Sequence, residues 1–341
     1  MLSDKQYEQL KSELDTCKNP VFFYDDDPDG LSSFLLFYRY LREGHGIVVK
    51  THPKLNAMLA PKIQEYHADK VFVLDVALLE QDFIDASPVP VIWVDHHGPY
   101  DRHNVKIFNP RLIKSDAYFP TSYLCYKTVK QDIWIGMVGS VADMHLPDFY
   151  KEFKKKYPQY SIGSRKVQEW YFKSKIGELI KVFSFCLKGQ TSDVRKRVNT
   201  LTRIAEPGEI LEQTTPAGKF IFKEYERIKR MYDSLLENAL KGVSKRSKML
   251  VFTYSDDTMS FTGDLANELL YRYPNKIILV GRQKGEEIRM SIRSTKKQIP
   301  AALEQAMVGL EGYGGGHEHA CGANVKHYHF HEFTQKLEKL L

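Results

Sequence analysis

Cysteine is scarce in this sequence, and the signals of several protein classes are absent. The 341 residues include four cysteines that stand singly, which excludes a disulfide framework or a zinc site built on cysteine pairs. No apolar run approaches the ~18 residues of a membrane span, and the polar start, residues 1–14, does not resemble a secretory signal. These absences predict a cytoplasmic protein with reduced thiols and no membrane partner.

Charge of either sign is also nearly balanced. Lys and Arg number 49 and Asp and Glu 43, which gives a net charge of +6. This excess is compatible with an anionic ligand but is too small to demonstrate one. Hydrophobic residues make up 43% of the chain, so it has ample material for a core, and its length predicts two domains.

The first 145 residues alternate short apolar runs with helical patterns, which predicts an α/β fold. The predicted buried strands are 21–24, 46–49, 71–74 and 89–94, and the predicted helices between them are 32–43 and 55–67. Near-continuous apolar runs are typical of parallel strands. We therefore predict a parallel, doubly wound N-terminal sheet with a helical extension, in a domain of residues 1–190.

A second α/β pattern follows a lysine-rich helical region. We predict a helical linker over 191–245 and a smaller mixed-sheet α/β domain over 246–341. Its predicted strands are 249–255, 276–283 and 287–294, and its predicted helices are 262–273 and 300–310. A glycine-rich loop, GYGGGHEHACGANV, and a closing helix complete it.

Acidic and histidine side chains gather where the predicted N-terminal strands end. They are Asp25, Asp27 and Asp29 in DDDPDG, Asp75 in VLDV, and Asp95, His96 and His97 in VDHH. The carboxyl ends of parallel strands share one sheet edge, so these side chains are expected to converge. A fourth feature, Asp143, is an isolated acid inside the apolar helical segment WIGMVGSVADMH, where a cationic partner would offset the cost of burial.

Each cluster also has a plainer interpretation. DDDPDG could be a solvated turn that caps the next helix, and the histidines could be exposed near another cap. Together, however, six residues supply enough oxygen and nitrogen donors for two divalent ions: Asp25, Asp27, Asp29, Asp75, His96 and Asp143. Oxygen-rich coordination with one imidazole favours Mn²⁺ or Mg²⁺ over a structural zinc. Two neighbouring ions are a usual device for hydrolysing phosphate esters.

The C-terminal region carries a second candidate site. Glycines 314–316 leave backbone N–H groups open to an anion, and His317 lies beside them. Arg293, in MSIRST, lies at the end of a predicted strand and could bind the same anion, such as a phosphate group. A glycine-rich surface loop without function is the plainer interpretation.

In this order, the motifs resemble the DHH phosphoesterase superfamily, in the branch that carries a DHHA1 domain and includes RecJ-like and nanoRNase-like enzymes. The resemblance spans Asp25 to Gly322. Asp25 stands where many relatives have histidine, and RecJ-type nucleases carry aspartate there as well. The resemblance implies that the six predicted ligands bind two ions, Mn²⁺ first and Mg²⁺ second, with Asp75 as the bridging carboxylate.

The resemblance also implies roles for other residues. His97 would contact the scissile phosphate or the leaving oxygen, with Asp95 supporting it, and Asn109 fits a recurrent family position. A terminal phosphate or nucleotide of the substrate would be bound by Arg293, Gly315, Gly316 and His317.

The implied reaction is phosphodiester hydrolysis by an exonuclease that acts on single-stranded RNA or DNA or on short oligonucleotides and releases nucleoside 5′-monophosphates. A small-molecule phosphodiesterase for linear or cyclic dinucleotides, or for adenosine bisphosphate, stays open within the same chemistry. A catalytically inactive RecJ-like replication scaffold is the alternative from another class. The lysine-rich helical region, including 151–156, could follow a phosphate backbone or be a solvated surface. A homodimer is also open.

Overall fold

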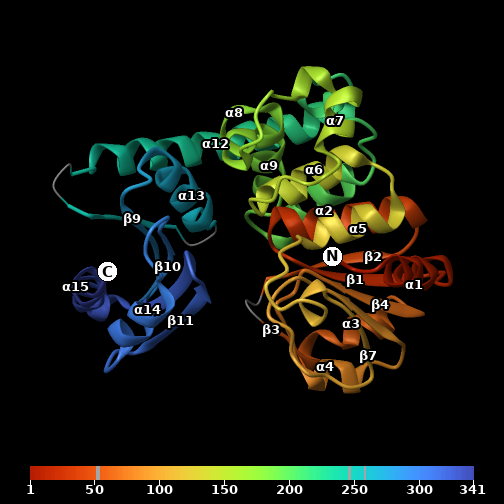
Figure 1. Ribbon diagram of the computed structural model, residues 1–341, viewed down its shortest axis with the longest axis horizontal. Coiled ribbons are helices and arrows are strands. Elements are labelled where there is room, and N and C mark those ends of the chain that lie inside the picture. Colours follow the sequence, from red (N-terminus) through yellow and green to blue (C-terminus); the bar gives the residue numbers. More distant parts are fainter. Residues whose placement is uncertain (51–53, 245–246, 257–258) are drawn as a thin grey trace. The chain divides into compact units, whose positions relative to one another are not determined.

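A computed structural model describes residues 1–341 except 51–53, 245–246 and 257–258 (Figure 1). The chain divides into two compact units, which we describe separately. Unit 1 comprises Met1–Leu187 and Ser192–Tyr225, and unit 2 comprises Lys188–Thr191 and Glu226–Leu341. Helix α12 (Pro216–Lys241) contributes residues to both units.

A five-stranded sheet forms the centre of unit 1. Its strands are β1 (Pro20–Asp25), β2 (His45–Val49), β4 (Lys70–Leu74), β6 (Val91–Val94) and β7 (Val105–Phe108). They lie in the order β2-β1-β4-β6-β7, and every neighbouring pair is parallel. The chain runs from β1 to β2 and then returns to the other side of β1, so the order reverses between β1 and β4. This confirms the predicted parallel, doubly wound sheet.

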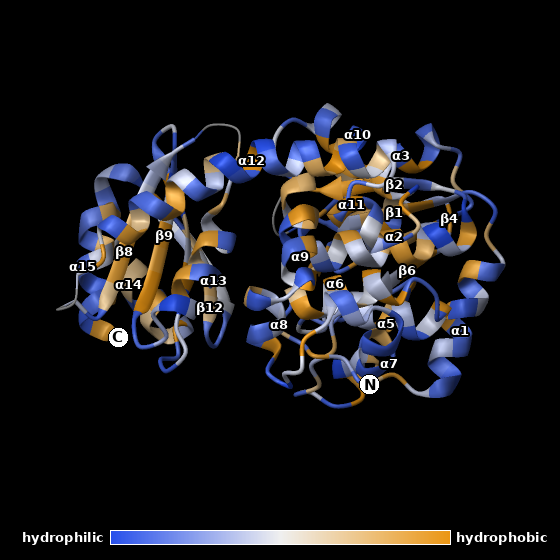
Figure 2. Ribbon diagram, turned by 90° about the horizontal axis from the view of Figure 1, so that it is seen from above, coloured by the Kyte–Doolittle hydropathy of each residue, from blue (hydrophilic) through white to orange (hydrophobic). Residues whose placement is uncertain are grey.

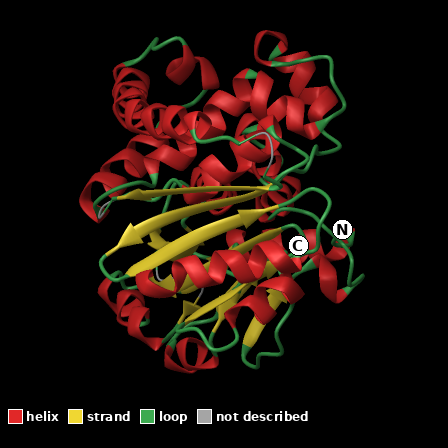
Figure 3. Ribbon diagram, turned by 90° about the vertical axis from the view of Figure 1, so that its left-hand side faces the viewer, coloured by secondary structure: helices red, strands yellow, loops and turns green. Residues whose placement is uncertain are grey.

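Helices cover both faces of this sheet (Figure 1), and Figure 3 distinguishes the helices, strands and loops of the described residues. One face carries α2 (Pro28–Leu41) and α5 (Thr121–Val129), and the other carries α3 (Pro61–Glu65) and α4 (Gln81–Ala86). Successive side chains of a strand point to opposite faces. In β1, the Phe22 ring therefore packs at 5.7 Å from Phe34 of α2, whereas the Phe23 ring lies 5.1 Å from Phe83 of α4.

The rest of unit 1 is mostly helical, as predicted. Its helices are α1 (Asp4–Asp15), α6 (Ile133–Ala142), α7 (Tyr150–Lys156), α8 (Val167–Lys173), α9 (Lys175–Cys186), α10 (Thr191–Leu201) and α11 (Pro207–Leu211). Short elements are β3 (Lys54–Leu55), which pairs with β5 (Leu78–Leu79), and the 3-10 turns η1 (Ala57–Leu59), η2 (Pro110–Leu112) and η3 (Pro158–Tyr160). Among the described helices, none combines the length and the hydropathy needed to span a membrane.

Unit 2 is built on a mixed sheet, as predicted. Its strands are β8 (Met249–Ser255), β9 (Ile277–Lys284), β10 (Glu287–Arg293), β11 (Gly312–His317) and β12 (Ala320–Lys326), in the order β11-β12-β10-β9-β8. Only β8 and β9 are parallel among these pairs. The helices are α13 (Thr262–Arg272), α14 (Pro300–Met307) and α15 (Phe330–Leu340), and η4 (His327–His329) precedes α15. Figure 2 shows the apolar character of β8 and β9.

Two predicted elements differ in the structure. The glycine-rich segment predicted as a loop, 312–325, instead forms the exposed edge strand β11 and most of β12, with which β11 pairs. Glycine has no side chain and so gives no alternating pattern that would predict a strand. It does allow β11 to lie close to β12, since a Cβ at Gly314 would lie 3.2 Å from the Gly322 carbonyl oxygen. The predicted helix 55–67 is instead η1 followed by the short α3, with a break before Pro61, which favours a helix start.

Candidate active site

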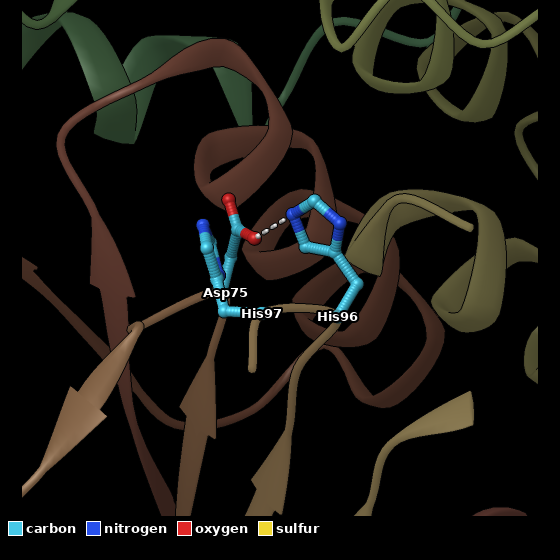
Figure 4. A group of neighbouring side chains, drawn as sticks. All are labelled: Asp75, His96 and His97. Atoms are coloured by element: carbon cyan, nitrogen blue, oxygen red, sulfur yellow. Dashed lines mark ion pairs between the residues drawn. The ribbon is translucent and has the colours of Figure 1, made fainter. Parts of the chain in front are cut away.

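The predicted acidic and histidine residues of unit 1 meet at the carboxyl edge of the parallel sheet. Asp25 is the last residue of β1, Asp75 follows β4, and His96 and His97 follow β6. Figure 4 shows Asp75 and the two histidines together. The strand order reverses between β1 and β4, and this is the crevice where open α/β sheets bind ligands.

Asp27 and Gly30 shape the turn from β1 into α2. Asp27 is the N-cap of α2, and its Oδ1 accepts a hydrogen bond of 2.8 Å from the Gly30 N–H. A Cβ at Gly30 would lie 2.7 Å from both the backbone N and O of Asp25. Glycine at this position therefore allows α2 to begin close to the end of β1. As a result, Asp25 and Asp27 lie at the same edge of the sheet.

Asp29 is fully buried and ties α2 to the start of α5. Its carboxylate accepts the N–H groups of Thr121 at 2.7 Å and Ser122 at 3.1 Å, and also the Ser122 hydroxyl. The N-cap residue of α5, Pro120, provides no side-chain hydrogen bond. Asp29 thus supplies the hydrogen-bond acceptor that the first N–H groups of α5 lack within their own helix.

Asp75 has a left-handed backbone, with φ of 62°, although it is not glycine. Such a conformation is strained and is concentrated at functional sites. Its N–H donates to the Val94 carbonyl at 3.0 Å, and its Oδ1 accepts the Thr121 hydroxyl at 3.0 Å. These bonds hold the buried carboxylate at the sheet edge.

His96 links two of the acids. Its Nε2 lies 3.3 Å from Asp75 Oδ1 and 3.3 Å from Asp143 Oδ2 (Figure 4 shows the first pair). Within the described residues, its buried Nδ1 has no hydrogen-bond partner. Burial lowers the pKa of His96, which favours the neutral imidazole that metals bind.

Asp143 occupies a different position from the predicted one. Helix α6 ends at Ala142, and Asp143 is its C-cap, with a side chain 24% exposed rather than buried inside the helix. The Tyr118 hydroxyl lies 2.7 Å from the Asp143 carbonyl oxygen and 3.2 Å from its carboxylate. The tyrosine helps to hold this acid beside His96.

The structure brings all six predicted ligands together. Donor atoms lie within 4.8 Å of one another in three groups: Asp25, Asp27 and Asp75; Asp29, His96 and Asp143; and Asp75, His96 and His97. Burial, followed by repulsion from neighbouring carboxylates, raises the pKa of Asp25, Asp29 and Asp75 well above the usual range. A divalent cation relieves such repulsion, and these donors fit a hard, oxygen-preferring ion.

A second cluster supports His97. Its ring Nδ1 lies 2.8 Å from Asp95 Oδ1, and its backbone N–H donates to Asp95 Oδ2 at 2.9 Å. The Asn109 side chain donates to the His97 carbonyl at 3.0 Å. Burial acts to lower the pKa of His97, but the hydrogen bond and charge of buried Asp95 outweigh it and raise the pKa to about 9. A protonated imidazole at this edge can donate a proton.

In unit 2, Arg293 and His317 lie at the same end of the sheet. Both pair with Ala320 of β12, from opposite sides, so two strand spacings, ~10 Å, separate their backbones. The Arg293 guanidinium donates to Asn267 Oδ1 at 2.9 Å and to the Cys321 carbonyl at 3.2 Å. Gly315, Gly316 and His317 are exposed. The predicted phosphate-binding residues thus share one region.

Three residues of the site escaped the sequence prediction. Thr121 and Ser122 bind the acids from α5, and Tyr118 contacts Asp143. Thr121 is 46 residues from Asp75 and 92 from Asp29. Hydroxyl residues at a helix start are common, so no local signal distinguished these.

Comparison with known proteins agrees with the fold and its motifs. Residues 21–152 match the model of the DHH family, N-terminal domain, and residues 247–341 match that of the DHHA1 domain. Among curated proteins, none matches the sequence.

Solved structures with a similar fold have low sequence identity. RecJ of Thermus thermophilus, in complex with Mn²⁺, has a TM-score of 0.72 and 18% identity over 98% of this chain, which spans 54% of that protein. CDC45 of Entamoeba histolytica has a TM-score of 0.53 and 10% identity over 98% of each chain. The pGpG-specific phosphodiesterase PggH of Vibrio cholerae has a TM-score of 0.52 and 13% identity, over 94% of this chain and 98% of that one. With both domain models matched in the predicted order, the chain carries a DHH-family N-terminal domain followed by a DHHA1 domain.

Proposed function

We propose that this protein is a metal-dependent phosphodiesterase that acts as an exonuclease on single-stranded nucleic acid or short oligonucleotides and releases nucleoside 5′-monophosphates. The observation that carries the proposal is the convergence of six acidic and histidine residues on one sheet edge. Within each group of three, the donor atoms lie within 4.8 Å of one another. A RecJ exonuclease bound to manganese, at a TM-score of 0.59, supports the same reaction class.

The proposed metal ligands divide into two sets that share an edge. Asp25, Asp27 and Asp75 would hold one ion, and Asp29, His96 and Asp143 the other. Asp75, whose Oδ1 lies 3.3 Å from His96 Nε2, would contribute to both sets. RecJ of T. thermophilus has been solved with Mn²⁺ and with Mg²⁺, so we propose Mn²⁺ first and Mg²⁺ second. Bound there, the ions supply charge stabilisation and a lowered pKa for the attacking water.

The remaining residues position the substrate and move a proton. His97, oriented by Asp95 and Asn109, holds the proton that the leaving oxygen receives. In unit 2, Arg293, Gly315, Gly316 and His317 would bind a phosphate of the substrate. The protein's four cysteines are unpaired, and we retain the cytoplasm as its proposed location.

A phosphodiesterase for dinucleotides is the second candidate. The observation that favours it is the similarity to PggH, a pGpG-specific enzyme, of which this chain spans 98%. An inactive scaffold is disfavoured because all six donors are present and adjacent.

Product analysis with Mn²⁺ tests the proposal. End-labelled single-stranded RNA and DNA of about two, five and twenty nucleotides would be compared, with an Asp75→Ala, Asp143→Ala double variant as the blank. Stepwise release of mononucleotides from the longest substrate is expected. Cleavage confined to dinucleotides would instead identify the second candidate, and the absence of any metal-dependent product would overturn both.

A further inference from the structure

A basic cavity of unit 1 lies outside the candidate metal centre. Helix α7 forms one wall and residues 162–165 form the other, and the cavity has a volume of about 470 Å³. The residues that line it are Tyr150, Lys151, Lys154, Lys155, Ile162, Gly163 and Arg165. Three lysines and an arginine thus surround one cavity that has no acidic lining residue.

These four cations contrast with a neighbouring lysine. Lys156, on the same helix, lies 3.8 Å from the Glu206 carboxylate. For the four lining cations, the structure shows no such ion pair with any residue that it describes. Positive charges held together without a counter-charge repel one another, and a bound anion relieves that repulsion.

Both walls are held in place by one buried residue, Trp170. Its ring lies 6.4 Å from that of Tyr150 and 6.2 Å from that of Phe153, both on α7. Its indole N–H donates to the Ser164 carbonyl at 2.9 Å, which fixes the opposite wall. The backbone of both walls is therefore fixed, while the exposed lysine and arginine side chains can adjust to a bound anion.

The cavity also has a fixed relation to the metal centre. Asp143 and Tyr150 are seven residues apart, so their Cα atoms are separated by at most ~25 Å. The intervening segment is packed: the His145 ring lies 5.4 Å from that of Tyr123, and the Phe149 ring 4.1 Å from that of Tyr126. A single strand of a few nucleotides is long enough to cover this distance.

We propose that this cavity is a phosphate subsite that binds the backbone of single-stranded nucleic acid at a distance from the cleaved bond. The inference rests on the proposed nuclease function and adds a contact that only longer substrates can make. Lysine and arginine at such a site neutralise phosphates without reading the bases. The subsite would favour oligonucleotides over dinucleotides.

A double variant, Lys154→Gln with Lys155→Gln, tests the subsite. Binding of a labelled single strand of about twelve nucleotides would be titrated in EDTA, where hydrolysis is stopped, at several salt concentrations. Lys5→Gln with Lys18→Gln removes the same charge from exposed positions elsewhere in unit 1 and serves as the control. Lys154→Arg with Lys155→Arg retains the charge.

Loss of two phosphate contacts is expected to weaken binding about 20-fold at ~0.1 M salt and to reduce the slope of log K against log salt by ~1.4. The control pair and the arginine pair should bind as the wild type does. Hydrolysis of a dinucleotide with Mn²⁺ should be unchanged in the glutamine variant, because that substrate is too short to reach the cavity. Inorganic phosphate should compete with the strand only at high concentration.

The subsite would be overturned by wild-type affinity and slope in the glutamine pair, by an equal loss in the control pair, or by failure of the wild type to bind the strand. Tight competition by free phosphate would assign the cavity to a small anion rather than a backbone and would also reject the proposal. Because binding is measured without metal, a protein that hydrolyses nothing but binds through the cavity would refute only the proposed function.

Discussion

Replacing Asp75 by asparagine should stabilise the metal-free protein and remove the stabilisation that Mn²⁺ gives. Asparagine tolerates the left-handed backbone at this position, where φ is 62°, and its side-chain oxygen can still accept the Thr121 hydroxyl. What the change removes is a buried carboxyl group that is costly to ionise, because its oxygen lies within 4.8 Å of those of Asp25 and Asp27.

The geometry sets the size of the effect. Two carboxylate charges 4.8 Å apart repel by ~3.5 kcal/mol at an effective dielectric constant of about 20. Relaxation and proton uptake reduce this repulsion, so we expect the free energy of unfolding to rise by about 1–2 kcal/mol. For a domain of this size, that raises Tm by about 2–8 °C. Wild-type protein at a hundredfold excess of Mn²⁺ over Kd should gain ~2.7 kcal/mol, and the variant should lose most of this gain.

Asp132→Asn is a matched control with the opposite expected sign. Asp132 also has a left-handed backbone, with φ of 55°, but its carboxylate pairs with Arg39 at 2.8 Å, and both side chains are less than one fifth exposed, at 16% and 12%. Its loss should cost about 1.5–3 kcal/mol and leave the Mn²⁺ effect intact. Thermal unfolding in EDTA and in Mn²⁺ measures both variants. The reasoning fails if Asp75→Asn destabilises the metal-free protein as Asp132→Asn does, or keeps the full Mn²⁺ gain.

Three further predictions separate chemistry, substrate binding and packing. His97→Gln should lower kcat for a dinucleotide about 10²–10⁴-fold while the rise of Tm in Mn²⁺ persists, and a variant with wild-type kcat would exclude proton donation. Arg293→Ala should raise KM more than it lowers kcat in initial-rate measurements, whereas an unchanged KM would remove this residue from the substrate site. Gly30→Ala should cost about 1–3 kcal/mol in urea unfolding, because its Cβ would lie 2.7 Å from backbone atoms of Asp25. Gly98→Ala should change stability by less than about 0.5 kcal/mol, because among the described residues no heavy atom beyond its chain neighbours lies within 4 Å of the new Cβ. Equal effects of the two changes would refute the packing argument.

The N-terminal sheet was predictable because its signals are local. Each of the runs 71–74 and 91–94 is apolar throughout, and an acid follows immediately, so the sequence alone indicated both the strands and the edge where Asp75 and Asp95 lie. Strand β7 escaped prediction because its Val-Lys-Ile-Phe segment is short and mixed in polarity. Strand β11 escaped because glycine gives no pattern.

The hydrogen bonds that orient the acids could not be predicted, because they join distant parts of the chain. Nothing near Thr121 indicates that its N–H would bind Asp29 or its hydroxyl Asp75. Asp143 shows a different limit: the apolar segment before it predicted burial, but the helix ends one residue earlier and leaves the carboxylate partly exposed. The sequence identified Asp143 as an acid near the site, but the exposure of its side chain depends on where helix α6 ends.

The hydrogen bonds between Asp29 and the start of α5 also link assembly of the candidate metal centre to the order in which the chain folds. Its partners are 92 residues apart, and such non-local contacts form only after the loop entropy of the intervening chain has been overcome. A nascent or truncated chain that ends before Thr121 lacks the groups that fix Asp29. The complete donor set therefore assembles only when the helical layer has docked on the sheet, and metal binding or chemistry that needs the whole set requires the fully folded unit.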